Sequence, residues 1–463
     1  MADRSCDVAI IGAGTAGIAA YRAAVADGAE AVLIERGPGG TTCARVGCMP
    51  SKLLIAAAEA AHAARLADLF GVRVGDVRVD GPAVMRRVRA ERDRFVGAVR
   101  DSVDEIPEAH RIAGEARFRD ARTLTVGGTT VAFRAAVIAT GSSPAVPKPL
   151  QGLGDRVLTT DTVFEIADLP RSLAVLGGGP VGIELAQAMA RLGVAVTLID
   201  ASPTLAGLTH PDLVGAAAEI FADDMALLRE TEIERAEADG AGVRVVWRGA
   251  DGTSGEGRFD RILAAAGRPP NRSGLDLGAA GLDRDADGLP RFDPRSFACD
   301  GAPLIIAGDA NAARPILHEA SRQGTIAGRN AAARARGDEL EAPEPWTPLA
   351  MVFTHPPTAR VGAPYDRDAR DRLVGEADFC DQGRARIEAA NRGGARLWAD
   401  PTGRLLGGEM IGPAVEHLAH ILADAIATGR TAQEFLDRPV YHPTVEEGLQ
   451  SAVAAIAKAA SDA

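Results

Sequence analysis

A supersecondary pattern that occurs twice constrains the fold of this chain more than any other feature of its sequence. The first copy spans residues 7–35 and contains an apolar run, a glycine turn, an Ala-rich helical stretch and a second apolar run. Its glycines are Gly12, Gly14 and Gly17, and the second run ends in Glu35. This order is typical of a dinucleotide-binding βαβ unit. The glycines admit a pyrophosphate at the helix N-terminus, and the acid accepts hydrogen bonds from a ribose.

The second copy spans residues 172–200, with Gly177, Gly179 and Gly182 in the turn and Asp200 at the end. The first glycine and the acid are 23 residues apart in both copies. A glycine motif alone is weak evidence, but here strand, helix and acid are in register in each copy. We therefore expect two Rossmann-like domains and two bound dinucleotides.

The acid of the second copy also bears on the choice of coenzyme. Asp200 disfavours a 2′-phosphate by charge repulsion, and residues 201–206 contain no Arg or Lys to receive one. An acid at this position typically accepts hydrogen bonds from the 2′-hydroxyl of NAD. The sequence therefore favours NAD(H) over NADP(H).

Length and charge exclude several other classes of protein. The 463 residues are too many for one hydrophobic core and suggest about three domains. A net charge of −12 and a pI near 5.3 disfavour nucleic acid and membrane partners. No apolar run is long enough to span a bilayer, and the N-terminus has no signal-peptide layout. Five cysteines are too few for a secreted disulfide framework, so we expect a cytoplasmic protein.

Two cysteines, Cys43 and Cys48, are separated by four residues within the stretch from Gly39 to Lys52, which we call the redox stretch. By themselves they could be core thiols, two ligands of a metal site, or a redox pair. In a cytoplasmic protein a persistent disulfide is more often catalytic than structural. The motifs around the pair have to decide between these alternatives.

The rest of the chain has weaker signals. We expect helices over residues 53–69, 82–104, 318–335 and 414–428, and strands over residues 350–354, 385–390, 396–398 and 405–411. An apolar run ending in Ala139, Thr140 and Gly141 precedes a Pro-containing segment and resembles a crossing between domains. Asp309 follows another apolar run, where it can bind a ligand hydroxyl or cap the next helix.

The predicted fold is α/β, with two Rossmann-like dinucleotide-binding domains and a C-terminal α+β domain after a Pro-rich linker at residues 343–348. We assign residues 1–147 and 273–342 to the first dinucleotide-binding domain, residues 148–272 to the second, and residues 343–463 to the C-terminal domain.

The motifs taken together resemble the class I pyridine nucleotide–disulfide oxidoreductases, most closely the dihydrolipoamide dehydrogenases. The resemblance covers essentially the whole chain, and the motifs occur in the same order: Gly12 to Gly17, Gly40 to Lys52, Ala139 to Gly141, Gly177 to Glu184, Gly308-Asp309, and His442 to Glu447. It implies FAD in the first unit, NAD(P)H in the second, and a homodimer formed by the C-terminal domain. The resemblance also implies that Thr140, Gly141 and Asp309 bind FAD, with Asp309 on the ribityl chain. It implies that Gly267 binds NAD(H).

The resemblance also implies the catalytic roles within the redox stretch. Cys43 would be the thiol that exchanges with substrate, and Cys48 would lie against the flavin. Lys52 and Glu184 would pair beside the flavin ring. The resemblance assigns no metal site.

His442 would act as the acid–base catalyst, oriented by Glu447 and supplied by the neighbouring subunit. This agrees with the chemistry, because thiol–disulfide exchange needs a thiolate and a nearby imidazole can accept the proton. A flavin is needed to couple sulfur exchange to hydride transfer. The family pattern also predicts a cis bond between His442 and Pro443.

The sequence therefore predicts an NAD-dependent dihydrolipoamide dehydrogenase that acts on a small-molecule or protein-bound dithiol. Arg45 and Tyr441 depart from the usual lipoyl pattern, which leaves the substrate open. Thr15 and Arg22 suggest an alternative, an NAD(P)H-dependent reductase of a low-molecular-weight disulfide similar to glutathione reductase. No cysteine follows Cys380, which disfavours chemistry that relies on a C-terminal redox pair, as in mercuric reductases.

Overall fold

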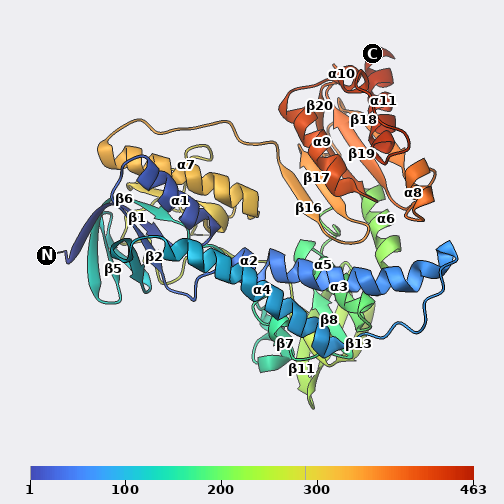
Figure 1. Ribbon diagram of the computed structural model, residues 1–463, viewed down its shortest axis with the longest axis horizontal. Helices are drawn as coiled ribbons and strands as arrows, with labels where there is room; N and C mark the ends of the chain where they lie inside the picture. The colour runs from blue at the N-terminus through green and yellow to red at the C-terminus, as the bar shows by residue number, and fades with distance from the viewer. Residues whose placement is uncertain (1, 287, 463) are drawn as a thin grey trace. The chain divides into compact units, whose positions relative to one another are not determined.

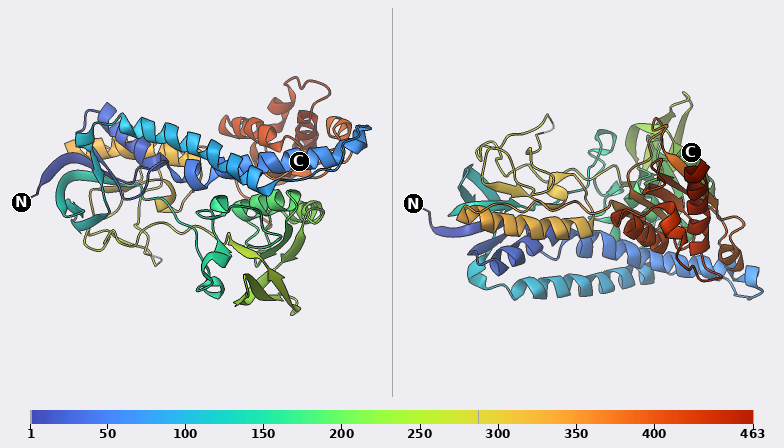
Figure 2. Two further views of the ribbon diagram at one scale, coloured as in Figure 1. Left: turned by 60° about the horizontal axis from the view of Figure 1, so that its bottom comes forward. Right: turned by 90° about the horizontal axis from the view of Figure 1, so that it is seen from above.

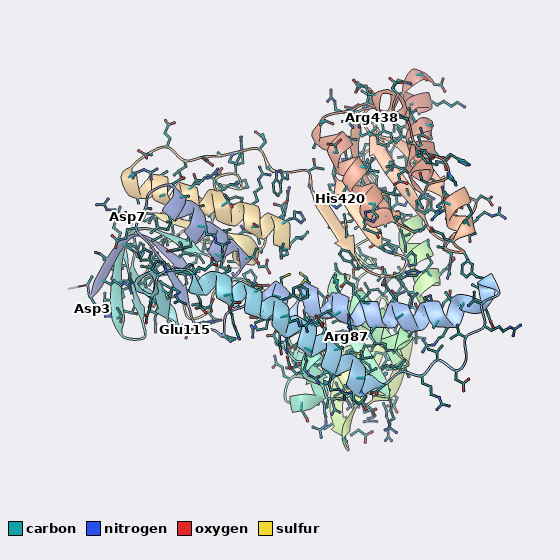
Figure 3. All side chains as sticks on the ribbon, viewed as in Figure 1. Asp3, Asp7, Arg87, Glu115, His420 and Arg438 are labelled. Atoms are coloured by element: carbon teal, nitrogen blue, oxygen red, sulfur yellow. The ribbon has the colours of Figure 1, made fainter. Side chains whose placement is uncertain are left out.

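The computed structural model describes residues 2–286 and 288–462, which form two compact units. Unit 1 comprises Met1–Pro50, Arg89–Ala145 and Arg268–Pro345, and unit 2 comprises Ser51–Val88, Val146–Gly267 and Trp346–Ala463. Two long helices, α3 (Cys48–Leu66) and α4 (Gly81–Asp104), begin in one unit and end in the other. Acidic and basic side chains are dispersed over the exposed surface, as Figure 3 shows for Asp3 and Arg87.

Unit 1 is built on a seven-stranded sheet of order β3-β2-β1-β6-β5-β4, with β15 also paired to β6. The strands are β1 (Arg4–Ile11), β2 (Ala31–Glu35), β3 (Arg111–Ala113), β4 (Ala116–Asp120), β5 (Thr123–Val126), β6 (Thr129–Ile138) and β15 (Leu304–Ile306). The pairings among β3, β2, β1, β6 and β15 are parallel, whereas β4 and β5 pair antiparallel. Successive residues of β1 face opposite sides: Ile10 and Ile11 belong to separate buried clusters on the two faces.

Two helices of unit 1, α1 (Thr15–Ala26) and α7 (Leu317–Arg336), lie side by side in Figures 1 and 2. Their backbones approach closely because α7 has glycines at Gly324 and Gly328. A Cβ at either position would come within 2.2 Å of a carbonyl oxygen of α1, that of Ala16 or Ala20. The shorter helical segments of this unit are α2 (Thr42–Val46), η2 (Glu108–His110) and η6 (Gly308–Asn311).

One part of unit 2 contains a parallel five-stranded sheet of order β10-β9-β8-β14-β7. Its strands are β7 (Val157–Leu158), β8 (Ser172–Leu176), β9 (Ala195–Asp200), β10 (Ala226–Arg229) and β14 (Arg261–Ala264), and its helices are α5 (Pro180–Arg191) and α6 (Pro211–Phe221). A three-stranded antiparallel sheet follows, made of β11 (Thr231–Asp239), β12 (Gly242–Gly249) and β13 (Ser254–Phe259). Short 3₁₀ segments are η1 (Ala67–Phe70), η3 (Lys148–Leu150), η4 (Gly154–Arg156) and η5 (Val163–Glu165).

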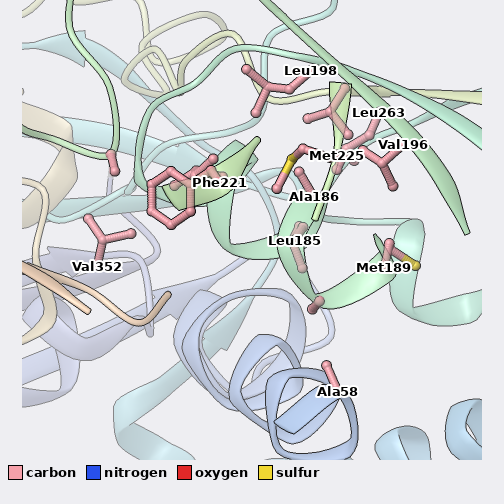
Figure 4. Packing of buried hydrophobic residues seen from close by; sticks show 14 of the residues in the cluster. Ala58, Leu185, Ala186, Met189, Val196, Leu198, Phe221, Met225, Leu263 and Val352 are labelled. Carbon is pink, nitrogen blue, oxygen red and sulfur yellow. The ribbon is translucent and has the colours of Figure 1, made fainter. Parts of the chain in front are cut away.

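The largest buried cluster of unit 2 joins α5 to the parallel sheet. Leu185 and Met189 of α5 belong to one cluster with Leu198 of β9 and with Phe221 at the end of α6, and Figure 4 labels all four. Phe221 is fully buried. This cluster fixes α5 on the sheet and thereby positions the side chains on the helix's other faces.

The C-terminal part of unit 2 is an antiparallel five-stranded sheet of order β16-β17-β20-β19-β18. Its strands are β16 (Leu349–Val352), β17 (Thr358–Gly362), β18 (Leu373–Asp378), β19 (Gly394–Ala399) and β20 (Leu405–Ile411), and its helices are α8 (Gly383–Ile387), α9 (Val415–Ala427), α10 (Ala432–Leu436) and α11 (Glu446–Asp462). The predicted strand at residues 385–390 is wrong. Its first three residues belong to α8 instead, because the side chain of Gln382 caps the helix by accepting a hydrogen bond from the Ala385 amide.

Candidate functional site

The first glycine turn connects β1 to α1 in unit 1. Gly12 has φ of +109°, which a residue with a side chain rarely adopts. A Cβ at Gly17 would come within 1.7 Å of the Gly12 carbonyl oxygen, so only glycine allows the helix to pack this closely on the turn. A Cβ at Gly14 would meet no atom within 4 Å, which leaves space at the helix N-terminus for an anionic group.

Glu35, at the end of β2, is held against the same turn. One carboxylate oxygen accepts a hydrogen bond from the Ala13 amide at 2.7 Å, and the other accepts one from the Gly37 amide at 2.7 Å. Each oxygen keeps further acceptor capacity for a ribose hydroxyl. The turn, the open helix end and the acid fit the adenosine pyrophosphate part of FAD.

Asp309 follows β15 at the carboxyl edge of the same sheet. Its carboxylate accepts a hydrogen bond from the Ser142 hydroxyl at 2.7 Å. Arg268 donates to the carbonyl oxygen of Ser142 at 3.0 Å, and Asn271 donates to the carbonyl oxygen of Thr140 at 3.0 Å. The structure thus brings the predicted Thr140 and Asp309 together with three polar residues that the sequence did not single out.

Gly141 lies within this group with φ of +68°, and a Cβ there would meet no atom within 4 Å. The backbone is therefore open to a ligand at this point. Ser142 directly follows the motif Ala139 to Gly141, which was visible in the sequence. A serine after a glycine, however, has no sequence signal that distinguishes a ligand contact from a turn residue.

The second glycine turn, between β8 and α5 in unit 2, repeats the geometry of the first. Gly177 has φ of +109°, and a Cβ at Gly182 would come within 1.8 Å of the Gly177 carbonyl oxygen. A Cβ at Gly179, or at Gly267 after β14, would meet no atom within 4 Å, so the backbone is open at both positions. Burial raises the pKa of Asp200, while hydrogen bonds from nearby backbone amides partly offset this effect. The turn therefore fits a second dinucleotide.

The redox stretch contains α2 and the first residues of α3. Cys43 is half-buried in α2, and Cys48 is the exposed first residue of α3. Thr41 caps α2 by accepting a hydrogen bond from the Ala44 amide at 3.2 Å, with its own backbone at φ of +56°.

One face of α4 anchors the redox stretch within unit 1. Arg92 is buried and donates to the carbonyl oxygen of Arg45 at 3.4 Å, and Arg100 donates at 3.1 Å to that of Pro38, which precedes the stretch. Between them Val96 packs on Gly40, where a Cβ would come within 2.7 Å of its methyl group. Residues four apart share a helix face, so the anchor is a continuous stripe.

Lys52 and Glu184 form an ion pair within unit 2, with Nζ 2.6 Å from Oε2. The Glu184 side chain is 7% exposed, and that of Lys52 is 34% exposed. The other carboxylate oxygen accepts a hydrogen bond from the Phe353 amide at 2.8 Å, and the ammonium lies 4.6 Å from the centroid of the Phe353 ring. The ammonium is therefore held in a defined position by a carboxylate and an aromatic face.

The same face of α5 holds the segment that follows β16. Gln187 accepts a hydrogen bond from the His355 amide at 2.8 Å and donates to the His355 carbonyl oxygen at 2.9 Å. Arg191 donates to that carbonyl oxygen at 2.9 Å. Together with Glu184 these residues recur every three or four positions along α5, which places them in one row. Sequence reasoning singled out Glu184 but missed Gln187 and Arg191, because their partner His355 lies far along the chain.

Arg191 also pairs with Asp224 at 3.0 Å, and both side chains are largely buried. Burial, followed by the charge of Arg191, lowers the pKa of His62 to about 4 and lowers that of His355. Both imidazoles are therefore predominantly neutral near pH 7.

His442 and Glu447 are joined by a hydrogen bond of 2.9 Å between Nδ1 and Oε1. The other oxygen of Glu447 accepts one from the Thr444 amide at 3.2 Å. The hydrogen bond from His442, followed by that from Thr444, lowers the pKa of Glu447, so the carboxylate is ionised and Nδ1 is the donor. The imidazole is 79% exposed, which leaves Nε2 available for proton transfer. The predicted cis bond between His442 and Pro443 is confirmed.

Three further observations concern the alternatives. Arg22 is exposed and donates to the Ser102 hydroxyl at 2.8 Å, which is the behaviour of a surface helix residue. Within residues 2–286 and 288–462, no helix is long and apolar enough to cross a bilayer. Across the same residues, no group of three or more His, Cys, Asp or Glu side chains is arranged to hold a metal ion.

Comparison with known proteins gives a consistent result. The family model described as pyridine nucleotide-disulphide oxidoreductase matches residues 6–324, and its dimerisation-domain model matches residues 349–453. A mercuric reductase from Acidithiobacillus ferrooxidans is 34% identical over 459 residues, which cover 96% of this chain and 81% of the relative. A dihydrolipoyl dehydrogenase from Haloferax volcanii is 31% identical over 466 residues, which cover 96% of this chain and 95% of the relative.

Solved structures share the fold. The HOCl-induced flavoprotein disulfide reductase RclA from Escherichia coli superimposes with a TM-score of 0.81 at 22% identity, covering 97% of this chain and 99% of that one. LpdA from Mycobacterium tuberculosis superimposes with a TM-score of 0.81 at 24% identity, with the same coverage. At these identities the likeness establishes the architecture alone.

Proposed function

The chain belongs to the pyridine nucleotide-disulphide oxidoreductase family, and on this premise we propose that it oxidises dihydrolipoyl groups with NAD⁺. Members of the family bind FAD and NAD(P)H, and both glycine turns of this chain fit a dinucleotide. In the proposed reaction a dithiol loses two electrons and two protons and becomes a disulfide. NAD⁺ gains a hydride, and one proton is released.

Thiol–disulfide exchange is the part of the reaction that this chain's own side chains carry out. His442 accepts the proton of a substrate thiol, and the thiolate attacks Sγ of Cys43 in a Cys43–Cys48 disulfide. The bond between the two cysteines breaks, and Cys48 leaves as a thiolate. The second substrate sulfur then attacks the first, which forms the product disulfide and releases Cys43. FAD, when bound, would supply the redox chemistry that couples the two thiols of Cys43 and Cys48 to hydride transfer to NAD⁺.

The observation that carries the proposal is the His442–Glu447 hydrogen bond of 2.9 Å in a chain that also has the redox stretch. A carboxylate on Nδ1 fixes the tautomer and orients the ring, and it stabilises the imidazolium that forms when Nε2 takes a proton. The family arrangement, in which His442 serves the cysteines of a second subunit, is part of the proposal.

We assign the Lys52–Glu184 pair to the flavin environment. An ammonium held 2.6 Å from a carboxylate supplies a fixed positive charge, and fixed charges stabilise negative charge without reorganisation. NAD(H) is the proposed coenzyme because Asp200 is a carboxylate at the end of β9, where NAD-dependent enzymes bind the ribose.

A homodimer is part of the proposal, with residues 343–463 as its dimerisation domain and residues 1–147, 148–272 and 273–342 assigned as predicted. The dimerisation-domain model covers residues 349–453. Exposed apolar side chains after α3 support an interface, since such clusters are typical of surfaces that another chain covers: Leu69, Phe70, Val72 and Val74. Sedimentation of the FAD-loaded protein tests the dimer directly.

Steady-state turnover of dihydrolipoamide with NAD⁺ tests the proposed activity. We expect turnover by the FAD-loaded protein and a loss of at least about 1,000-fold in Cys43→Ser and Cys48→Ser, because either change removes the exchange chemistry. Cys380→Ser is the matched control: this cysteine is exposed on the C-terminal part of unit 2 and should be dispensable. Negligible turnover in both directions would refute the assignment.

Reduction of a Hg(II) dithiolate is a second candidate, favoured by the 34% identity to mercuric reductases. The cysteines outside the redox stretch offer little support for it. Cys6 and Cys299 are buried, and burial raises the pKa of both thiols to about 12, so neither supplies a thiolate near pH 7. Consumption of NADPH or NADH in the presence of Hg(II) tests this candidate. The same assay with glutathione disulfide tests the reductase alternative, and both are separate from dihydrolipoamide turnover.

A further inference from the structure

Arg229 lies beside Asp200 at the carboxyl edge of the nucleotide-binding sheet of unit 2. It is the last residue of β10, as Asp200 is the last residue of β9, and the two are register partners in adjacent parallel strands. Register partners project to the same face of a sheet. Ligands of α/β sheets bind at this edge.

The guanidinium of Arg229 is held over the loop that follows Asp200. Nη2 donates to the carbonyl oxygen of Pro203 at 3.2 Å. Nε is buried and has no hydrogen-bond acceptor among the residues that the structure describes. The charge of Arg229 is one of the influences that lower the pKa of Asp200 against the larger effect of burial, so the two groups are within electrostatic reach.

This arrangement changes the coenzyme argument. Residues 201–206 contain no cation, but the neighbouring strand supplies one at the position that faces the acid. A guanidinium has a planar fork of donors that matches a phosphate, and it remains charged at any physiological pH. It therefore offsets the repulsion between Asp200 and a 2′-phosphate.

We propose that Arg229 is a specificity-determining residue of the nicotinamide-nucleotide site, which binds a 2′-phosphate there and so admits NADP(H) as well as NAD(H). The inference rests on the proposed assignment of the second glycine turn to the nicotinamide nucleotide. It predicts that affinities for NAD⁺ and NADP⁺ differ by less than about tenfold, whereas an acid without a cation would discriminate more strongly.

Calorimetric titration of the FAD-loaded protein with NAD⁺ and with NADP⁺ tests the proposal without any disulfide substrate. We expect Arg229→Met to weaken NADP⁺ binding at least tenfold and to change NAD⁺ binding less than twofold. Arg229→Lys keeps the charge and should restore part of the NADP⁺ affinity. Arg235→Met removes an exposed arginine of β11 and is the matched control for net charge; it should alter neither affinity.

Salt dependence gives a second readout. In the unsubstituted protein NADP⁺ affinity should fall more steeply with ionic strength than NAD⁺ affinity, and Arg229→Met should remove that difference. A ratio of the two affinities that Arg229→Met leaves unchanged, with tryptophan fluorescence showing an intact fold, would overturn the proposal. Absence of dihydrolipoamide turnover would not affect the proposal for Arg229. Failure to bind either nucleotide would overturn both that proposal and the proposed function.

Discussion

The Lys52–Glu184 pair gives the sharpest quantitative test of the site. Two unit charges 2.6 Å apart attract by about 6 kcal/mol at an effective dielectric constant of 20, and desolvation of both groups offsets most of this energy. Lys52→Met leaves a carboxylate that is 7% exposed without its counterion, which we expect to cost about 3 kcal/mol of unfolding free energy.

Glu184→Gln should cost less, about 1.5 kcal/mol, because the ammonium of Lys52 is 34% exposed and water screens it. The glutamine oxygen can still accept the hydrogen bond from Phe353. The double variant contains no uncompensated charge, so we expect it to lose about 2 kcal/mol, less than Lys52→Met alone. The two substitutions should therefore be coupled by about 2–3 kcal/mol.

Urea unfolding followed by tryptophan fluorescence measures these changes. All three tryptophans, Trp247, Trp346 and Trp398, lie in unit 2, as does the ion pair, so the signal reports the unit that is perturbed. Linear extrapolation of the unit 2 transition gives each free energy.

The surface pair Arg384–Glu388 is the matched control for this cycle. Its side chains are 44% and 41% exposed, and its coupling should stay below about 0.5 kcal/mol. Additivity within about 0.5 kcal/mol for the Lys52 and Glu184 substitutions would refute the claim that they form a shielded pair.

Three further predictions concern the turn, the redox stretch and the dyad. Gly17→Ala places a Cβ within 1.7 Å of the Gly12 carbonyl oxygen, so the desalted protein should retain less than about a tenth of its FAD. Arg92→Met should raise hydrogen exchange across the redox stretch at least threefold, while Arg94→Met, an exposed change on the same helix, should not. Glu447→Gln should lower kcat about tenfold with KM unchanged. The pKa of Glu447 lies below its ordinary value of 4.5. Its contribution to kcat, as an ionised carboxylate on His442, should therefore be present above pH 4.5 and be lost as the pH falls through the lower folded value. A kcat–pH profile of the unsubstituted protein and of Glu447→Gln checks this.

The two dinucleotide units could be read from the sequence because their signals are local. The glycine that needs positive φ, the glycine that needs close packing and the acid all lie within one strand–helix–strand unit. The same holds for His442 and Glu447, which are five residues apart and meet across one turn. Short segments with weak patterns were harder, as α8 shows: its cap by Gln382 outweighs any strand preference.

Contacts between distant segments could not be predicted from local patterns, and the Lys52–Glu184 pair was expected only from the family resemblance. The row on α5 binds the backbone of Phe353 and His355, and any polar residues with this spacing would look the same in the sequence. Arg229 becomes a neighbour of Asp200 only because β10 pairs with β9. The cation that faces Asp200 therefore lies outside residues 201–206, on a neighbouring strand.

A count of thiols tests the central claim, that Cys43 and Cys48 form a disulfide which exchanges electrons with a nicotinamide nucleotide. The FAD-loaded protein is treated anaerobically with NADH, denatured, and titrated with a thiol reagent. The chain has five cysteines, and the account predicts that NADH raises the number of titratable thiols by two per chain. Cys48→Ser should show no increase. An unchanged count in the unsubstituted protein, or the same increase in Cys48→Ser, would contradict the account.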